Sequence, residues 1–169
     1  MNEEKKFVII GKIEDTFGVD GKLKVKPFSP QRVWENTNTI YLKRKTGEYV
    51  PFEVEKAEVR GRKVYLKLKG IDSEDDALRL SGAHIFLPEE ELPKLKSGEY
   101  YYYQLVGSKV VGRNGEELGT VDYIHDGGMY PMLVLDNNQI IPFTKNFVVK
   151  VDPENKTIVV DEEKIPKGE

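Results

Sequence analysis

The sequence predicts an all-β protein made of two small β-barrels and one short helix. Short runs of alternating apolar and polar residues recur along the 169-residue chain, and turn residues separate them. One segment with a helical start signal interrupts this pattern. A stretch rich in proline and charge at residues 89–98 divides the chain into two β-rich halves. We therefore expect domains at residues 1–88 and 99–169, joined by a linker at 89–98.

The first half contains six expected strands and the helix. Alternation and flanking turn residues define the strands at residues 7–13, 22–26, 39–43, 50–59, 63–68 and 83–87. Pro51 suits only a strand start or edge, because proline has no backbone N–H to donate. Residues 73–80 begin with a capping serine, place three acids in the first turn and end before Gly82. This pattern is typical of a short helix.

The second half begins with residues 99–107 and continues as short strands. We expect these strands at residues 109–111, 118–125, 132–135, 139–141, 147–151 and 157–160. Asn114-Gly115 is a strong hairpin signal, and residues 136–138 and 152–155 are typical turn sequences. Together these elements predict a second small barrel.

Composition excludes several classes of protein. The chain has no cysteine, which rules out disulfides, thiol catalysis and cysteine-based zinc sites. The longest apolar run, residues 7–10, is far shorter than a membrane span, and residues 1–6 are not followed by a signal-peptide core. We therefore expect a soluble, cytoplasmic protein without membrane association.

The two halves differ in charge. Residues 1–88 contain 17 Lys and Arg against 14 Asp and Glu, whereas residues 89–169 contain 9 against 15. A basic half suits nucleic acid, and an acidic half suits a basic protein. The alternative is that these charges, which are interleaved along strands, only solvate the strand faces.

Catalytic chemistry has no positive support in the sequence. His84 lies within a strand, where a structural role is favoured, and His125 precedes a turn in which it could pair with Asp126. The carboxylate clusters are contiguous runs typical of solvated segments: residues 14–15, 74–76, 89–91 and 161–163. No phosphate-binding or dinucleotide-binding motif is present. We expect no catalytic residue, no cofactor and no metal, with a hydrolase based on His125 and Asp126 as an alternative.

Four consecutive tyrosines, Tyr100 to Tyr103, mark the start of the second half. In an extended chain they point alternately to two faces, so that two fill a core and two face outward. Outward aromatics suit a protein interface or stacking on unpaired bases. The alternative is that all four pack against the linker and the barrel.

Several motifs occur in the order found in the ribosome maturation factor RimM family. Residues 11–13 and 16–25 resemble its opening signature, residues 70–72 with Ala77, Leu80 and Gly82 resemble its helical segment, and residues 99–107 resemble the start of its C-terminal PRC-barrel domain. Residues 118–121, 133–135, 141–143 and 151–152 follow at the spacing of that domain. The resemblance covers residues 7–161. Phe17, Tyr102, Gln104 and residues 128–131 depart from it, and Phe17 stands where the family usually has histidine.

The resemblance implies a non-catalytic assembly factor of the small ribosomal subunit. Proteins of this family bind the nineteenth protein of that subunit, in its head, and assist 16S rRNA processing on the pre-30S particle. The resemblance also implies an N-terminal barrel like those of translation factors. The family's paired tyrosines align with Tyr100 and Tyr101, which gives these two residues the partner-binding role. We expect a monomer.

Charge alone suggests where RNA phosphates would bind. The candidate contacts in the basic half are Lys22, Lys24, Lys26, Arg60, Arg62 and Lys63. Solvated strand faces explain these positions equally well. Two further alternatives remain: a stand-alone small RNA-binding module, and a PRC-type scaffold of photosynthetic membranes, which would require a membrane span.

Overall fold

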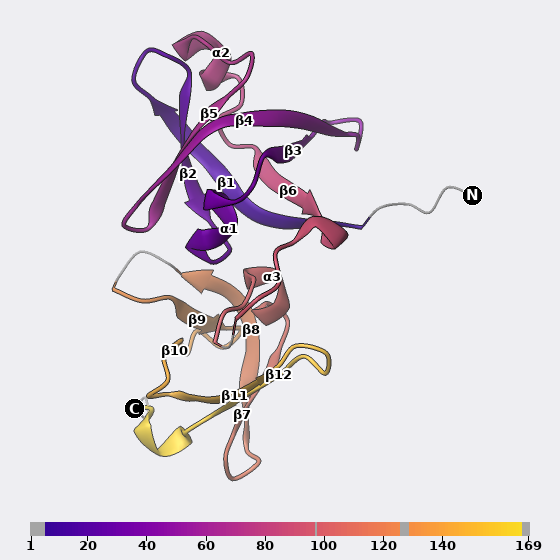
Figure 1. Ribbon diagram of the computed structural model, residues 1–169. Coiled ribbons are helices and arrows are strands. Elements are labelled where there is room, and N and C mark those ends of the chain that lie inside the picture. Colours follow the sequence, from indigo (N-terminus) through magenta and orange to yellow (C-terminus); the bar gives the residue numbers. More distant parts are fainter. Residues whose placement is uncertain (1–5, 97, 126–128, 167–169) are drawn as a thin grey trace, which may run out of the picture. The chain divides into compact units, whose positions relative to one another are not determined.

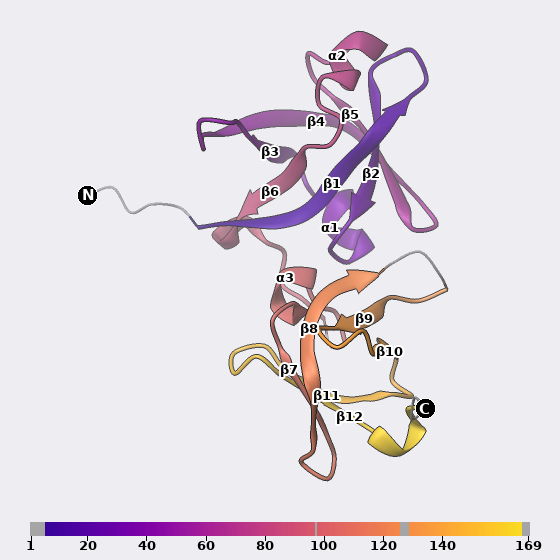
Figure 2. The same ribbon diagram turned by 180° about the vertical axis from the view of Figure 1, so that it is seen from behind.

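The computed structural model describes residues 6–96, 98–125 and 129–166 (Figure 1). The chain divides into two compact units, Met1–Tyr101 and Tyr102–Glu169. Both units consist mainly of strands with a few short helices, as Figures 1 and 2 show, so the predicted all-β class is confirmed. The domain boundaries at residues 88 and 99 stay a prediction, and residues 89–91 form a short 3-10 helix, η1.

The first unit is a closed six-stranded barrel. Its strands are β1 (Phe7–Phe17), β2 (Lys22–Pro27), β3 (Thr39–Lys43), β4 (Tyr49–Arg60), β5 (Lys63–Leu68) and β6 (His84–Pro88). They close in the order β1-β2-β5-β4-β3-β6, and every pair is antiparallel. Each strand occupies a region where the sequence predicts one, although β1 continues four residues beyond the expected end. Closure removes the exposed edges of the sheet.

Alternation along the strands places the barrel core. In β2, Leu23 and Val25 are fully buried, and in β5 the buried residues are Val64, Leu66 and Leu68. The side chains between them point to the outer face because successive residues in a strand point to opposite sides. The core of this unit is therefore a filled barrel interior, and lysines occupy much of the outside.

Two short helices pack on the barrel. The predicted helix is confirmed as α2 (Glu74–Leu78), and the Ser73 hydroxyl accepts a hydrogen bond from the Asp76 backbone N–H at 3.1 Å. The sequence did not predict α1 (Gln31–Glu35), which buries Trp34. A Cβ on Gly11 would lie 2.8 Å from the Trp34 ring, so glycine at that position admits the indole.

The turn between β1 and β2 depends on a second glycine. Gly21 has φ +87°, which favours glycine. A Cβ at this position would also lie 2.2 Å from the carbonyl oxygen of Ile71. The turn therefore needs glycine both for its backbone conformation and for the close approach of the chain before α2.

The second unit is a six-stranded sheet. Its strands are β7 (Lys109–Gly112), β8 (Glu117–His125), β9 (Met132–Leu135), β10 (Ile140–Pro142), β11 (Val148–Asp152) and β12 (Thr157–Val160). The order is β10-β9-β8-β7-β12-β11, and only the β7–β12 pair is parallel among the described residues. All six strands lie within one residue of the predicted positions. Val121, Leu133, Ile141 and Ile158 are among the side chains that form its core.

The tyrosine run differs from the extended chain considered above. Tyr102 begins helix α3 (Tyr102–Leu105), so the alternation expected for a strand does not apply to Tyr102 and Tyr103. Leu105, at the end of this turn of helix, is buried. A short 3-10 helix, η2 (Glu162–Lys164), follows the last strand. No helix in the described part of the chain is both long and apolar enough to cross a membrane.

Candidate functional site

The outer side of the barrel gathers most of the predicted phosphate contacts on one surface, here called the basic face. It comprises Lys22, Lys24 and Lys26 on β2, Lys63 on β5 and Arg60 on β4. Register brings the three strands together: Lys24 lies opposite Tyr65, and Arg60 lies opposite Lys63. Arg62, the sixth predicted residue, lies in the two-residue turn between β4 and β5. The role of these residues in binding nucleic acid stays a prediction.

Acidic side chains neutralise part of the basic face. Lys63 pairs with Glu14, and the Arg60 guanidinium donates to the Glu58 carboxylate at 3.0 Å. This hydrogen bond, together with the positive charges of Lys56 and Lys22, lowers the pKa of Glu58, and the same pair raises the pKa of Arg60. Three cations thus act on one carboxylate, which leaves the area around Glu58 with an excess of positive charge.

Two aromatic rings lie among these cations. The Phe17 and Tyr65 ring centroids are 4.6 Å apart, and the planes are tilted by 55°. The Arg60 guanidinium carbon lies 5.2 Å from the Tyr65 centroid and 5.8 Å from the Phe17 centroid, within cation–π range. Phe17 remains 39% exposed at the end of β1. We call Phe17, Tyr65 and Arg60 the ring cluster.

Sequence reasoning missed the ring cluster. Tyr65 was expected only as part of a strand, and its partner Phe17 is about 48 positions away along the chain. The sequence offers one signal, which is a phenylalanine beside a glycine turn, at a position where the family that the chain resembles usually has histidine. The sequence does not show whether this ring is buried, so its exposure is a finding of the structure.

His84 lines a shallow pocket of about 540 Å³ together with Lys12 and Lys26. Burial lowers the pKa of His84, and the positive charge of Lys12 on the neighbouring strand lowers it further. The nearby Ser81 hydroxyl donates to the Glu14 carbonyl at 3.1 Å. His84 itself is exposed at the start of β6, so its structural role stays a prediction. His125 ends β8, and its proposed partner Asp126 lies outside the described residues.

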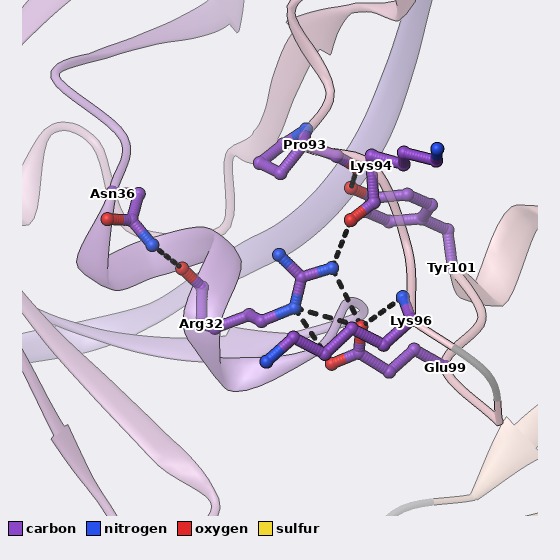
Figure 3. Close-up of polar contacts among 7 residues, drawn as sticks. All are labelled: Arg32, Asn36, Pro93, Lys94, Lys96, Glu99 and Tyr101. Carbon is purple, nitrogen blue, oxygen red and sulfur yellow. Dashed lines mark hydrogen bonds and ion pairs between the residues drawn. The ribbon is translucent and has the colours of Figure 1, made fainter.

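A cluster around Arg32 holds the end of the first unit (Figure 3). From helix α1, the Arg32 guanidinium binds both carboxylate oxygens of Glu99 at 2.9 and 3.0 Å and also donates to the Lys94 carbonyl. The Lys96 backbone N–H donates to the same carboxylate at 2.7 Å. These bonds lower the pKa of Glu99, Arg32 having the largest effect. The forked geometry ties Lys94 and Glu99 to α1.

The two predicted partner-binding tyrosines follow directly after this cluster. Tyr101 is only 2% exposed, and its hydroxyl donates to the Pro93 carbonyl at 3.0 Å, as Figure 3 shows. Tyr100 is half-buried. In this structure Tyr101 therefore contributes to the packing of the segment. The partner-binding role of both residues stays a prediction.

The second unit has a different surface chemistry. Residues 102–169 include 7 Lys and Arg against 11 Asp and Glu. A groove of about 1130 Å³ is lined largely by polar and acidic side chains, among them Asn137, Glu162 and Glu163. Large apolar side chains are exposed on this unit, and Met129 is 90% exposed. The surface combines negative charge with exposed apolar area, which suits a basic protein partner.

No cluster of three or more His, Asp or Glu side chains suited to a metal occurs within residues 6–96, 98–125 and 129–166. The candidate surfaces present charged, aromatic and apolar groups.

Comparisons with known proteins cover both units. The family model for the RimM N-terminal domain matches residues 8–92, and the model for the RimM PRC barrel domain matches residues 102–165. A ribosome maturation factor RimM from Aquifex aeolicus is 50% identical over 163 residues, which cover 96% of this chain and 98% of the relative.

More distant relatives carry the same name. A ribosome maturation factor RimM from Thermosipho africanus is 32% identical over 165 residues, covering 94% of this chain and 89% of the relative. The crystal structure of a putative 16S ribosomal RNA processing protein RimM from Pseudomonas aeruginosa is 29% identical. The match covers 92% of this chain and 97% of the chain in that structure, with a TM-score of 0.49.

Proposed function

The chain belongs to the RimM family of ribosome maturation factors, and we propose that it supports 16S rRNA processing by binding a protein of the small-subunit head. The partner is the nineteenth protein of the small subunit, bound on the pre-30S particle. The observation that carries this proposal is the difference in surface chemistry between the units. One has a basic face, and the other has an acidic surface with exposed apolar side chains.

The second unit is the proposed receptor for the head protein. Ribosomal proteins bind RNA and are commonly basic, so the acidic side chains near the groove would attract such a partner. The exposed apolar residues of this unit would supply the buried centre of an interface: Val106, Tyr123, Met129, Tyr130, Ile140 and Val149. Electrostatic attraction and apolar burial together would give both speed and affinity of association.

The tyrosines at the start of this region would extend the interface. Because Arg32 binds Glu99, the backbone leading into Tyr100 is fixed within the first unit. Tyr101 is buried and anchors the segment through Pro93. In this proposal the half-buried Tyr100 makes the contact, and Tyr101 holds it in place.

The basic face would bind phosphates of the same particle. Lys22, Lys24, Lys26, Arg60, Arg62 and Lys63 would contact the backbone of 16S rRNA near the bound protein. Binding both components in one complex would favour their correct arrangement without any bond being made or broken. We expect this action in the cytoplasm, by a monomer without cofactor.

The proposal is tested by titrating the purified full chain with the isolated nineteenth protein in a calorimeter. We expect 1:1 binding that weakens by roughly 30-fold or more in Tyr100→Ala, the loss typical of an interface hot spot. Tyr65→Ala is the matched control, since it removes a tyrosine from the basic face and should leave this affinity unchanged. Tyr101→Phe removes only the hydroxyl, so it tests the hydrogen bond to the Pro93 carbonyl while the packing of the ring is kept.

A stand-alone RNA-binding module is the second candidate, and the basic face with its ring cluster favours it. The same titration distinguishes the two. Absence of protein binding by the wild type, combined with clear affinity for 16S rRNA fragments, would replace the proposed partner by RNA alone. Equal loss of binding in Tyr65→Ala and Tyr100→Ala would refute the assignment of the interface to the tyrosine segment.

A further inference from the structure

The ring cluster is an unusual feature on an otherwise charged barrel surface. Phe17 is exposed at the end of a strand in which Val8, Ile10 and Ile13 are buried, and its ring packs at a tilt of 55° against the half-buried Tyr65. The Arg60 guanidinium lies over both rings and is oriented by Glu58. Aromatic rings and a planar guanidinium are the groups that proteins use to stack on nucleobases.

We propose that the ring cluster is a stacking site for one unpaired nucleobase of a single-stranded RNA. The base would stack on the exposed side of Phe17, with Tyr65 supporting the ring from behind. This inference rests on the proposed function, because it assigns to the basic face the class of RNA that it binds.

The neighbouring lysines are placed to bind the phosphates on either side of such a base. Lys22 lies directly opposite Phe17 in the β1–β2 ladder. Lys24 is the next outward residue of β2, and it lies opposite Tyr65 on β5. Outward residues on one strand are about 7 Å apart, and Lys22 and Lys24 follow each other along β2, one opposite Phe17 and the other opposite Tyr65. A strand of RNA following β2 would thus meet a cation, a ring and a second cation.

Single-stranded RNA fits these groups better than the two other occupants that a basic surface attracts. In a duplex the bases are stacked on one another, so their faces are not available to Phe17, and only the phosphates would bind. An acidic peptide would pair with the lysines through its carboxylates, which do not stack on Phe17. Neither occupant would use the exposed ring.

The test measures binding of the full chain to a fluorescein-labelled, unstructured RNA of about 12 nucleotides by anisotropy. A set of otherwise identical RNAs carries one abasic nucleotide at each position in turn. With the wild-type protein, we expect the abasic change at the stacking position to weaken binding about fivefold or more. In Phe17→Leu, which keeps apolar packing but removes the aromatic face, that sensitivity should disappear.

Charge variants separate stacking from phosphate binding. Lys22→Gln should weaken binding to all the RNAs and reduce the slope of log affinity against log salt concentration by about one. Phe17→Leu should leave that slope unchanged. Phe147→Leu in the second unit is the aromatic control and should bind like the wild type. Thermal unfolding of each variant checks that the fold is retained.

Three outcomes would overturn the inference. The first is an affinity that does not depend on the abasic position in the wild type or in Phe17→Leu. The second is binding of the protein to duplex RNA as tightly as to single-stranded RNA. The third is tighter binding to an acidic peptide than to RNA. In each case the titration with the nineteenth protein is unaffected, so failure of the stacking site is distinguishable from failure of the proposed function.

Discussion

The two units are both small β structures, yet their folds and surfaces differ in kind. The first closes six antiparallel strands into a barrel and presents lysines around the exposed Phe17 ring and the half-buried Tyr65 ring. The second pairs its first strand, β7, in parallel with its last strand, β12, and has β10 and β11 at the two ends of the sheet order. It exposes apolar side chains on a surface rich in acidic residues. The barrel's closed surface suits contacts by side chains alone, whereas the second unit also offers apolar area for a protein.

In the proposed function, the two surfaces of opposite charge bind different components of the particle. The ratio of cations to acids and the exposure of aromatic groups distinguish the two surfaces more clearly than secondary structure does. Three changes test whether the units are as separate in stability as they are in chemistry.

The largest effect is expected from removing a core leucine in each unit. Leu66 on β5 and Leu133 on β9 are both fully buried, so replacement by alanine should cost about 2–5 kcal/mol in the unit concerned. Trp34 is the only tryptophan and is buried in the first unit, so its fluorescence reports on that unit. Leu66→Ala should lower the unfolding midpoint seen by fluorescence, and Leu133→Ala should lower only the part of the transition seen by far-UV circular dichroism.

The outcome has a direct meaning for the comparison. A shift of the Trp34 transition by Leu133→Ala equal to that by Leu66→Ala would show that the units unfold as one cooperative body. Conservative Leu66→Met and Leu133→Met variants serve as controls, because they nearly conserve volume and should cost below about 1.5 kcal/mol.

The second effect concerns one turn in each unit. Gly21 and Gly115 both have φ +87°, but only at Gly21 would a Cβ meet backbone, the Ile71 carbonyl. Gly115→Ala should therefore cost about 1–2 kcal/mol from conformation alone, and Gly21→Ala about 2–5 kcal/mol because steric displacement adds to it. Urea unfolding measures both. Equal costs for the two variants would contradict the close approach of residues 21 and 71.

The smallest effect is expected at Glu99. Its pKa lies below the ordinary value of 4.5 because Arg32 and the Lys96 N–H stabilise the carboxylate. A lowered pKa in the folded state gives stability that is complete above pH 4.5 and is lost as the pH falls through the folded-state value. Glu99→Gln should therefore be slightly less stable than wild type at pH 7, and the difference should vanish in acid.

The Trp34 fluorescence midpoint, measured from pH 7 to pH 3, records this difference. Glu35→Gln is the matched control, since Glu35 is an exposed carboxylate on the same helix as Arg32. A difference between Glu99→Gln and wild type that persists unchanged at pH 3 would rule out the ion pair as its cause.

The strands were predictable because their signal is local. Lys22, Leu23 and Lys24 alternate with period two, and a half-buried strand requires that period whatever its neighbours are. The same holds for Ser73, whose hydroxyl caps a helix that begins at the next residue. In these cases the residues that make the structure are adjacent in the sequence.

The features that the sequence did not predict depend on residues far apart in the chain. Helix α1 has five residues and no side-chain cap, and Trp34 is buried beside Gly11, more than 20 positions earlier. The ring cluster joins β1 to β5, and the Arg32 fork reaches Glu99 across 67 positions. For the tyrosines, four identical aromatics fit a strand and a helix equally well, so periodicity could not decide.

The parallel pairing of β7 with β12 has a consequence for the order of folding. β7 is the first strand of its sheet and β12 the last in sequence, so the two are neighbours only after residue 160 has been synthesised. The barrel can close once residue 88 is made, because its last strand pairs with β1. During translation the barrel can thus be complete while the second sheet still lacks its connection. The chain would thus complete its basic face before the acidic surface of the second unit.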